Sequence, residues 1–149
     1  MRAVVQRVDR ASVKIDSREF SSIGQGLLIL LGVEKDDSAT DADYIIEKTV
    51  NLRIFEDEQG KMNLSLADIG GEMMIVSQFT LLGDCIKGRR PSFARAEDPE
   101  KANQLYEYFV NQAAPRVKKL ATGKFQEMMK VDLVNDGPVT ILLDSKKKF

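Results

Sequence analysis

The sequence predicts an α/β fold: a single domain over residues 1–149, with mixed, mostly antiparallel β-sheets and two amphipathic helices packed on one face. Segments with strand character outnumber those with helical character, and strand-like runs separate the two helical segments. Residues 27–33, LLILLGV, have no polar interruption, which is typical of a central strand covered on both faces. An α+β arrangement fits the same pattern, and the order of the strands stays open.

The remaining strands are predicted from alternation and turn signals. Residues 1–8 are rich in valine, residues 11–16 alternate apolar with polar side chains, and a polar turn then leads into a short partner strand at residues 19–23. Residues 51–57 alternate and end in a polar turn. The stretch at residues 72–82 is predicted to open as a strand, from its apolar run at residues 73–76. Further strands are predicted at residues 128–135 and 139–145 and are joined by a turn at residues 136–138. The tail at residues 146–148 is predicted to be a solvated end.

Two segments have the periodicity of amphipathic helices. The first follows Ser38, which forms a variant capping box with Asp41, and its apolar stripe comprises Ala42, Ile45, Ile46, Thr49 and Val50. The second is predicted to begin at Pro99 with Asp98 as its N-cap and to end at Pro115. Its stripe comprises Ala102, Leu105, Tyr106, Phe109 and Val110.

Composition excludes several classes of function. No apolar run approaches the roughly 20 residues that a membrane span requires, and the N-terminus lacks the pattern of a signal peptide. The single cysteine, Cys85, excludes an internal disulfide, so we expect a cytoplasmic location. A net charge of −1 gives no global basic field, so any RNA contact must be local. The chain has no histidine, which excludes a Ser-His-Asp triad, a Cys-His pair and imidazole metal ligands.

The stretch at residues 72–82, EMMIVSQFTLL, changes abruptly from apolar to polar. Ser77, Gln78 and Thr80 stand where a buried strand would continue with aliphatic side chains. Polar groups near a core are hydrogen-bonded or functional, so these residues are candidates for a site. The alternative interpretation is a strand that runs out into a solvated turn.

Residues 87–95, KGRRPSFAR, place four cations within nine residues without an intervening acid. On a loop bent by glycine and proline, Lys87, Arg89 and Arg90 are suited to binding phosphates, and Phe93 to stacking on a base. The alternative is an ordinary solvated loop.

Residues 135–140, NDGPVT, have the composition of a hairpin turn. Proline directly after Gly137 restricts that turn. X-Pro bonds are the usual site of a cis peptide, which can aim neighbouring carbonyl oxygens in one direction.

Together these motifs resemble those of the D-aminoacyl-tRNA deacylases, also called D-tyrosyl-tRNA deacylases. The resemblance runs nearly end to end, through MRAVVQRV, NLRIFEDEQGKMN, VSQFTL, KGRRPSF and LVNDGPVT. SQFT and NDGPVT, in this order and at this separation, make a specific signature.

The resemblance implies a homodimeric enzyme that hydrolyses the ester between a D-amino acid and the terminal adenosine of tRNA, a chiral proofreading step in translation. It also implies that Ser77, Gln78, Phe79 and Thr80 line the pocket for the aminoacyl end. Of these, Ser77, Gln78 and Thr80 are the catalytic candidates, and Phe79 is expected to bind substrate. No metal or organic cofactor belongs to the family.

The resemblance further implies that Gly137-Pro138 is a cis dipeptide that reaches from one subunit into its partner's pocket and excludes L-amino acids. The chain departs from the family after Phe125, where members commonly show Phe-Gly-Ala or Phe-Ala-Ala. Here Gln126 and Glu127 replace the small residues, while the methionine that follows one residue further on is matched by Met129, a substrate-binding candidate. If this segment walls the pocket, it alters the range of accepted D-side chains, and of glycine.

Two routes of hydrolysis fit a site without histidine. Thr80 could attack the ester as a weakly activated nucleophile, or the pocket could orient the substrate's own 2′-hydroxyl and a water molecule. We favour the second, because no candidate general base stands beside Thr80 in the sequence. Backbone N–H donors to the oxyanion would supply the rest.

Two other functions fit parts of the pattern. A non-enzymatic RNA-binding module would use the basic loop and would not need the SQFT pocket. A hydrolase of small D-amino-acid esters would ignore tRNA and would give no role to Arg89 or Arg90.

Overall fold

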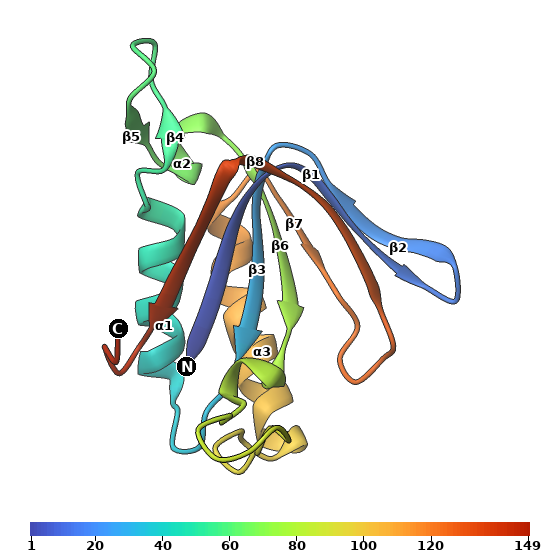
Figure 1. Ribbon diagram of the computed structural model, residues 1–149. Coiled ribbons are helices and arrows are strands. Elements are labelled where there is room, and N and C mark those ends of the chain that lie inside the picture. The colour runs from blue at the N-terminus through green and yellow to red at the C-terminus, as the bar shows by residue number, and fades with distance from the viewer.

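The computed structural model describes residues 1–149, and its centre is a six-stranded sheet that folds over on itself (Figure 1). Two long strands, β1 (Arg2–Ile15) and β8 (Lys130–Asp144), run antiparallel over nearly their whole length. The first half of β1 pairs with β3 (Gly26–Gly32) and the second half with β2 (Arg18–Ile23). Because β1 changes partners along its length, the sheet divides into two halves, which diverge from the bend in β1 and β8 (Figure 1).

Parallel strands complete the larger half of the sheet. β6 (Glu72–Ser77) lies parallel to β3, and β7 (Lys119–Thr122) lies parallel to β6, so the order is β2-β1-β3-β6-β7 with β8 also paired to β1. A separate two-stranded sheet is formed by β4 (Phe55–Glu56) and β5 (Met62–Leu64). The fold class predicted from the sequence is confirmed.

The helices cover one face of the larger half (Figure 1). α1 (Ala39–Asn51) starts at the predicted capping box, in which the Asp41 carboxylate accepts a hydrogen bond from the Ser38 N–H at 2.9 Å. α3 (Pro99–Ala113) starts at the predicted proline. A one-turn 3₁₀ helix, η2 (Ala114–Arg116), then contains Pro115, so the α-helix ends just before that residue, as expected. None of the helices is long and apolar enough to cross a membrane.

The sheet carries a hydrophobic core on each face. The larger core lies between the sheet and the helices and includes Leu27, Ile29 and Leu31 of β3. The smaller core lies on the opposite face, where the second half of β1 folds over, and includes Leu28 and Met74. β3 is therefore buried on both faces, as its sequence predicts.

The structure corrects several predicted strands. Residues 1–8 and 11–16 belong to one strand, β1, and residues 128–135 and 139–145 contribute to one strand, β8. The NDGPVT segment is therefore not a hairpin turn: both sides of it pair with β1, and the register shifts where β1 bends. Only two residues of the predicted strand at residues 51–57 pair as a strand, in β4.

Other corrections concern two short elements, the start of α3 and the C-terminal tail. The short helix α2 (Leu66–Ile69) and strand β7 were not predicted. Asp98 occupies the N-cap position of α3, but its side chain makes no capping hydrogen bond. The C-terminal tail is not simply solvated, because Lys146 and Lys148 both form ion pairs with the buried Glu34.

Candidate active site

Ser77 and Gln78 lie where the parallel strand β6 ends. Ser77 is in register with Leu31 of β3, and the Gln78 N–H donates to the Leu31 carbonyl at 2.7 Å. The chain then turns into a 3₁₀ helix, η1 (Phe79–Leu82), which packs against Gly32. A Cβ at position 32 would lie 3.0 Å from the Gln78 carbonyl oxygen, so any larger residue would require η1 to shift. Side chains at the end of β6 are therefore held in place by main-chain contacts.

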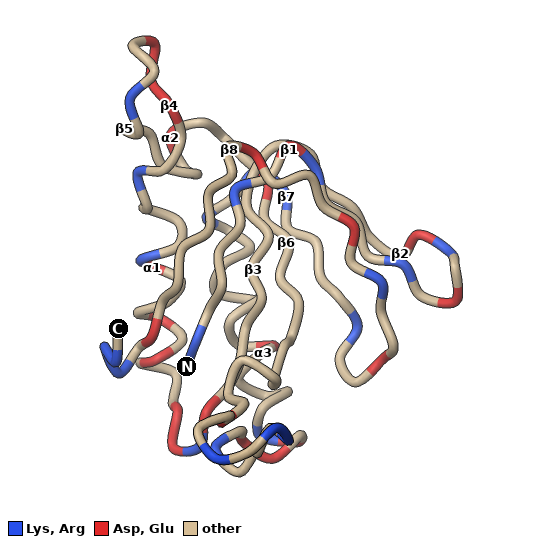
Figure 2. The backbone as a smooth tube through the Cα atoms, in the orientation of Figure 1, with Lys and Arg blue, Asp and Glu red and all other residues tan.

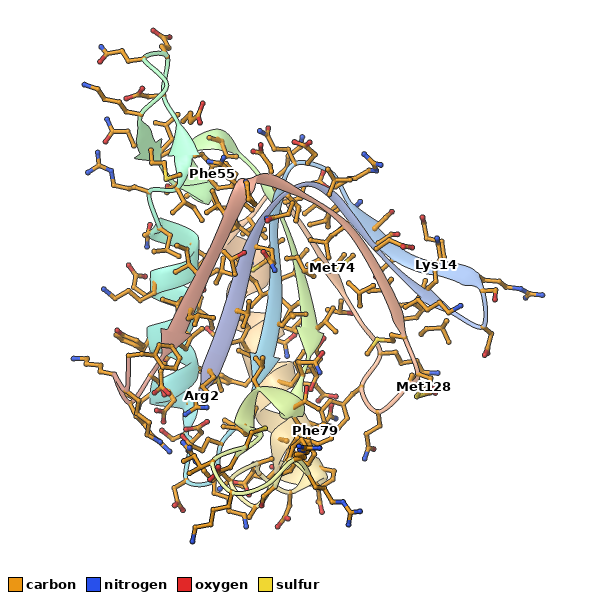
Figure 3. The ribbon with its side chains drawn as sticks, viewed as in Figure 1. Arg2, Lys14, Phe55, Met74, Phe79 and Met128 are labelled. Atoms are coloured by element: carbon orange, nitrogen blue, oxygen red, sulfur yellow. The ribbon has the colours of Figure 1, made fainter.

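A cavity of about 530 Å³ opens beside these residues. Its first wall contains Ser77, Gln78 and Phe79, and the opposite wall is the segment from Phe125 to Met129. Phe79 and Met128 mark the two walls in Figure 3. The structure thus brings the SQF residues together with Met129, although 52 positions separate Ser77 from Met129 in the sequence. Gln126 and Glu127, the residues that depart from the family pattern, are part of the cavity lining.

Thr80 does not lie in the wall of this cavity. It is exposed on η1, and its hydroxyl accepts a hydrogen bond from the Gln78 carboxamide. No carboxylate or amine pairs with the Thr80 hydroxyl, so nothing in the structure prepares it to act as a nucleophile. Its contact with Gln78 makes it a residue that orients the amide.

The wall formed by residues 125–129 is a tight turn. The Glu127 N–H donates to the Lys124 carbonyl at 3.2 Å, and Gln126 adopts a left-handed conformation with φ of 61°. Gln126 is the third residue of this β-turn, a position that requires a positive φ and therefore favours glycine. Met128 is 90% exposed, whereas Met129 turns inward and its Sδ lies 3.3 Å from the Lys124 nitrogen. The amide and carboxylate that replace small residues therefore stand on a strained, exposed turn.

The N-terminus of α3 supplies a third wall that sequence reasoning missed. Glu97, Pro99 and Ala102 line the cavity there. The Glu97 side chain is only 8% exposed and forms an ion pair with Lys101 at 2.7 Å. The hydrogen bond from Lys101, followed by one from the Asp98 N–H, lowers the pKa of Glu97 below its ordinary value. An acid before a helix is a common feature, so nothing in the sequence indicated that Glu97 lines a cavity.

The predicted basic loop leaves the end of η1 and is closed at its base by two backbone hydrogen bonds between Asp84 and Ser92, of 2.8 and 2.9 Å. Lys87, Arg89 and Arg90 are exposed and form no ion pair. Figure 2 shows blue stretches of the tube gathered at the lower end of the molecule, where this loop lies. These cations are free to bind an anionic partner.

The C-terminal end of the loop is anchored to the body of the molecule by two side chains. Arg95, the fourth cation of the motif, pairs with the buried carboxylate of Glu34. Phe93 packs edge-on against Phe79 of the cavity wall, with ring centroids 5.1 Å apart. The basic loop is therefore joined directly to the site.

Gly137 and Pro138 lie at the bend of β8, at the opposite end of the strands from Ser77. Their peptide bond is cis, as the sequence predicts, and both residues are exposed. The buried guanidinium of Arg7 donates to the Asp136 carbonyl at 3.2 Å, and a Cβ at position 137 would lie 2.8 Å from its Nη2 atom. Neither residue lines the cavity of its own chain.

No three His, Cys, Asp or Glu side chains come together in an arrangement that could hold a metal ion. The candidate groups in the cavity are therefore the hydroxyl of Ser77, the carboxamides of Gln78 and Gln126, and the carboxylates of Glu97 and Glu127.

The fold and the cavity define a small α/β protein whose histidine-free pocket, lined by both apolar and polar side chains, lies at the ends of parallel strands, beside a basic loop. A family model described as D-Tyr-tRNA(Tyr) deacylase matches residues 4–144, and the chain belongs to this family. The D-aminoacyl-tRNA deacylases of Syntrophus aciditrophicus (strain SB) and Clostridioides difficile (strain 630) are 65% and 60% identical to it over 149 residues, covering the full length of both chains in each case.

Solved structures share this fold. The c-Myc DNA Unwinding Element Binding Protein is 42% identical, with a TM-score of 0.92 over 97% of this chain and 98% of its own. A probable eukaryotic D-amino acid tRNA deacylase has the same fold, with a TM-score of 0.79 at 16% identity over 95% of this chain and 97% of its own. The family resemblance seen in the sequence is confirmed.

Proposed function

We propose that this protein hydrolyses the ester bond of D-aminoacyl-tRNA and releases the free D-amino acid and tRNA. The observation that carries this proposal is the cavity that joins Ser77, Gln78 and Phe79 to the wall at Met129, next to a loop of unpaired cations. The pocket is suited to the aminoacyl ester of an aminoacyl-tRNA, and the adjoining phosphate-binding loop is suited to its backbone. The relatives' names point to the same reaction.

Hydrolysis proceeds by attack of water on the ester carbonyl, in which the bond to the ribose oxygen breaks and that oxygen takes up a proton. The first hydrogen bond within η1 joins the Leu81 N–H to the Gln78 carbonyl, so the N–H groups of Phe79 and Thr80 have no acceptor in this turn. They are available to stabilise the developing oxyanion. The substrate's 2′-hydroxyl and Gln78 orient the water, and Thr80 orients Gln78.

The decisive experiment offers matched D- and L-tyrosyl-tRNA to the pure protein. We expect hydrolysis of the D-ester at least a hundredfold faster than that of the L-ester, and slow or no hydrolysis of free D-tyrosine methyl ester. Rapid cleavage of the small ester would favour a general D-ester hydrolase. Binding of nucleic acid without cleavage of either tRNA would favour a non-enzymatic role and would overturn the proposal.

The role of Thr80 separates the two chemical routes. Thr80→Ala removes the acceptor of the Gln78 amide, so we expect turnover to fall roughly tenfold to a hundredfold but not to vanish. Ser77→Ala is the companion variant within the cavity wall. Mass spectrometry of quenched reactions that finds an aminoacyl group on Thr80 would instead establish covalent catalysis.

The basic loop binds the tRNA backbone through Lys87, Arg89 and Arg90 in this proposal. Reversing the charges of Arg89 and Arg90 should weaken tRNA binding and reduce its salt dependence, because each released phosphate contact lowers the salt slope by about one. Folding should not change, since both side chains are exposed and unpaired. Reversing Lys124, which pairs with Glu127, is the matched control. Unchanged tRNA affinity after both reversals would contradict this role.

The site is completed by a second copy of the chain. Gly137 and Pro138 are exposed and far along the strands from Ser77, and β8 pairs with β1 alone, which leaves its other edge free for a partner. Exposed Leu133 and Leu142 on the same strand add apolar surface to that edge. In a homodimer the Gly137-Pro138 bend enters the partner's cavity, where main-chain oxygens exclude an L-side chain. Glycyl-tRNA, which has no side chain to exclude, should be hydrolysed too.

Mixing two inactive variants tests this arrangement. Gln78→Ala damages the cavity, and Gly137→Val damages the bend because its Cβ would meet Arg7. If each site combines two chains, unfolding and refolding the mixture should restore about a quarter of the wild-type activity, since half of the random dimers carry one intact site. Sedimentation should show a dimer. An inactive mixture, or an active monomer, would contradict the shared site.

A further inference from the structure

The cavity lining is negatively charged, and the reaction proposed above assigns no role to this charge. Its lining includes two carboxylates, Glu97 and Glu127, and no lysine or arginine. The unpaired cations lie outside it, on the loop after η1. An aminoacyl-tRNA carries the complementary charges. Its backbone is anionic, and its α-amino group, with an ordinary pKa near 7.7–8.0, is largely a cationic ammonium group at neutral pH. The cavity therefore suits a cation.

The two carboxylates differ in their surroundings. Glu127 is 44% exposed and paired with Lys124 at 3.1 Å, so water and salt screen its charge. The Glu97 side chain is 8% exposed. At that depth a charge is screened less, and its attraction for an ammonium group is stronger. Glu97 is thus the better anchor.

Glu97 is also held in position and keeps room for another donor. Its Oε1 accepts a hydrogen bond from the Asp98 N–H at 3.0 Å, and its Oε2 accepts one from Lys101 Nζ at 2.7 Å. Each carboxylate oxygen can accept two hydrogen bonds, so both retain free capacity. Lys101 is 54% exposed, so its ammonium group keeps contact with water while it pairs with Glu97.

We propose that Glu97 accepts a hydrogen bond from the α-ammonium group of the aminoacyl end and is the residue that selects esters with a free amino group. This inference depends on the proposed function and deepens it. Esters in which the nitrogen is acylated or replaced by oxygen lack the cation and bind less tightly. The cavity would thereby discriminate against tRNA that carries an N-blocked amino acid or a peptide.

The test compares D-phenylalanyl-tRNA with D-phenyllactyl-tRNA, in which a hydroxyl replaces the ammonium group and the rest is unchanged. With the wild-type protein we expect a KM roughly tenfold lower for the amino ester, the range of a hydrogen bond between charged groups. Glu97→Gln should remove this gap by raising KM for the amino ester alone, with kcat changed less than twofold. Glu127→Gln, on the opposite wall, should preserve the gap.

Two results would overturn the inference. Equal KM values for the two esters with the wild-type protein would do so without any variant. A gap that persists in Glu97→Gln, or an equal rise in KM for both esters, would show that Glu97 only supports the start of α3. Failure of the wild-type protein to hydrolyse either ester would instead refute the proposed function, so the two failures are distinguishable.

Discussion

The wall at the end of β6 and the wall at residues 125–129 face the same cavity but are held in different ways. The first is fixed by main-chain contacts, with Gln78 bonded to Leu31 and η1 packed onto Gly32. The second is a turn with a left-handed Gln126 and an almost fully exposed Met128. Fixed main chain suits chemistry, which requires accurate positions, whereas an exposed turn tolerates the substitutions that alter substrate range. In the proposed function, the first wall serves catalysis and the second wall serves selectivity.

The largest effect is expected at Glu34, which lies beside the first wall and should make the free energy of unfolding depend on pH. Glu34 follows Val33 of the cavity and anchors Arg95; burial raises its pKa, but hydrogen bonds from Lys148 and Arg95 outweigh this and lower it to about 2, from 4.5. A lowered pKa stabilises the folded state above pH 4.5, and this contribution of roughly 3 kcal/mol is lost as the pH falls towards 2. Urea unfolding at pH 6, 4 and 3 should show the loss. Glu34→Gln should be less stable at pH 6 and show a weaker pH dependence.

Gly32→Ala tests the main-chain contact itself. The new Cβ would lie 2.5 Å from Leu82 Cδ2 and 3.0 Å from the Gln78 oxygen. We expect a loss of about 1–3 kcal/mol in the free energy of unfolding and at least a tenfold loss of deacylation, because η1 must move. Gly24→Ala is the matched control, since its nearest contact would be an ordinary 3.8 Å. Normal activity in Gly32→Ala would mean that the wall is not fixed there.

Gln126→Gly, in the second wall, should increase the free energy of unfolding, in contrast to Gly32→Ala. Glycine adopts the observed φ of 61° without the penalty that a Cβ brings, so we expect a gain of about 0.5–1 kcal/mol in the free energy of unfolding. The amide also leaves the cavity, which should broaden the range of accepted D-side chains. Chemical denaturation and a panel of D-aminoacyl-tRNAs measure the two effects. A destabilised variant would show that the Gln126 side chain stabilises the turn.

The smallest effect is expected at Met128, which is 90% exposed. Met128→Ser should change the free energy of unfolding by less than about 0.5 kcal/mol, because little apolar surface becomes exposed. A larger loss in the assembled protein, measured by thermal unfolding at two protein concentrations, would indicate that a partner subunit covers this tip.

The sequence predicted the first wall of the site better than the others, because a local change from apolar to polar marks it. The cis bond at Gly137-Pro138 was also predicted correctly. Glu97 was missed because its place in the cavity lining depends on α3 packing beside β6, a contact between distant segments. Thr80 was expected to line the pocket, but the 3₁₀ turn after Gln78 leaves it exposed on η1, outside the cavity wall.

The same limit explains the errors in the fold. Asn135, Asp136 and Gly137 have the composition of a hairpin turn, and only the pairing of Asn135 and Thr140, on either side of the bend, with a strand more than a hundred residues earlier shows that β8 continues past them. Local composition carries no information about such a partner. The central strand was predicted correctly because burial on both faces leaves its mark within seven residues.

That central strand also restricts how the gene can change in length. Leu27, Ile29 and Leu31 face one core, and Leu28 and Leu30 face the other. Deleting a single codon within β3 would exchange the two sets and pull Gly32 out of register with Gln78. Replacements of similar size should be tolerated there, whereas insertions and deletions should accumulate in exposed segments such as the turn between β4 and β5. The register of these seven residues thus determines which side chains face each core and where the site lies.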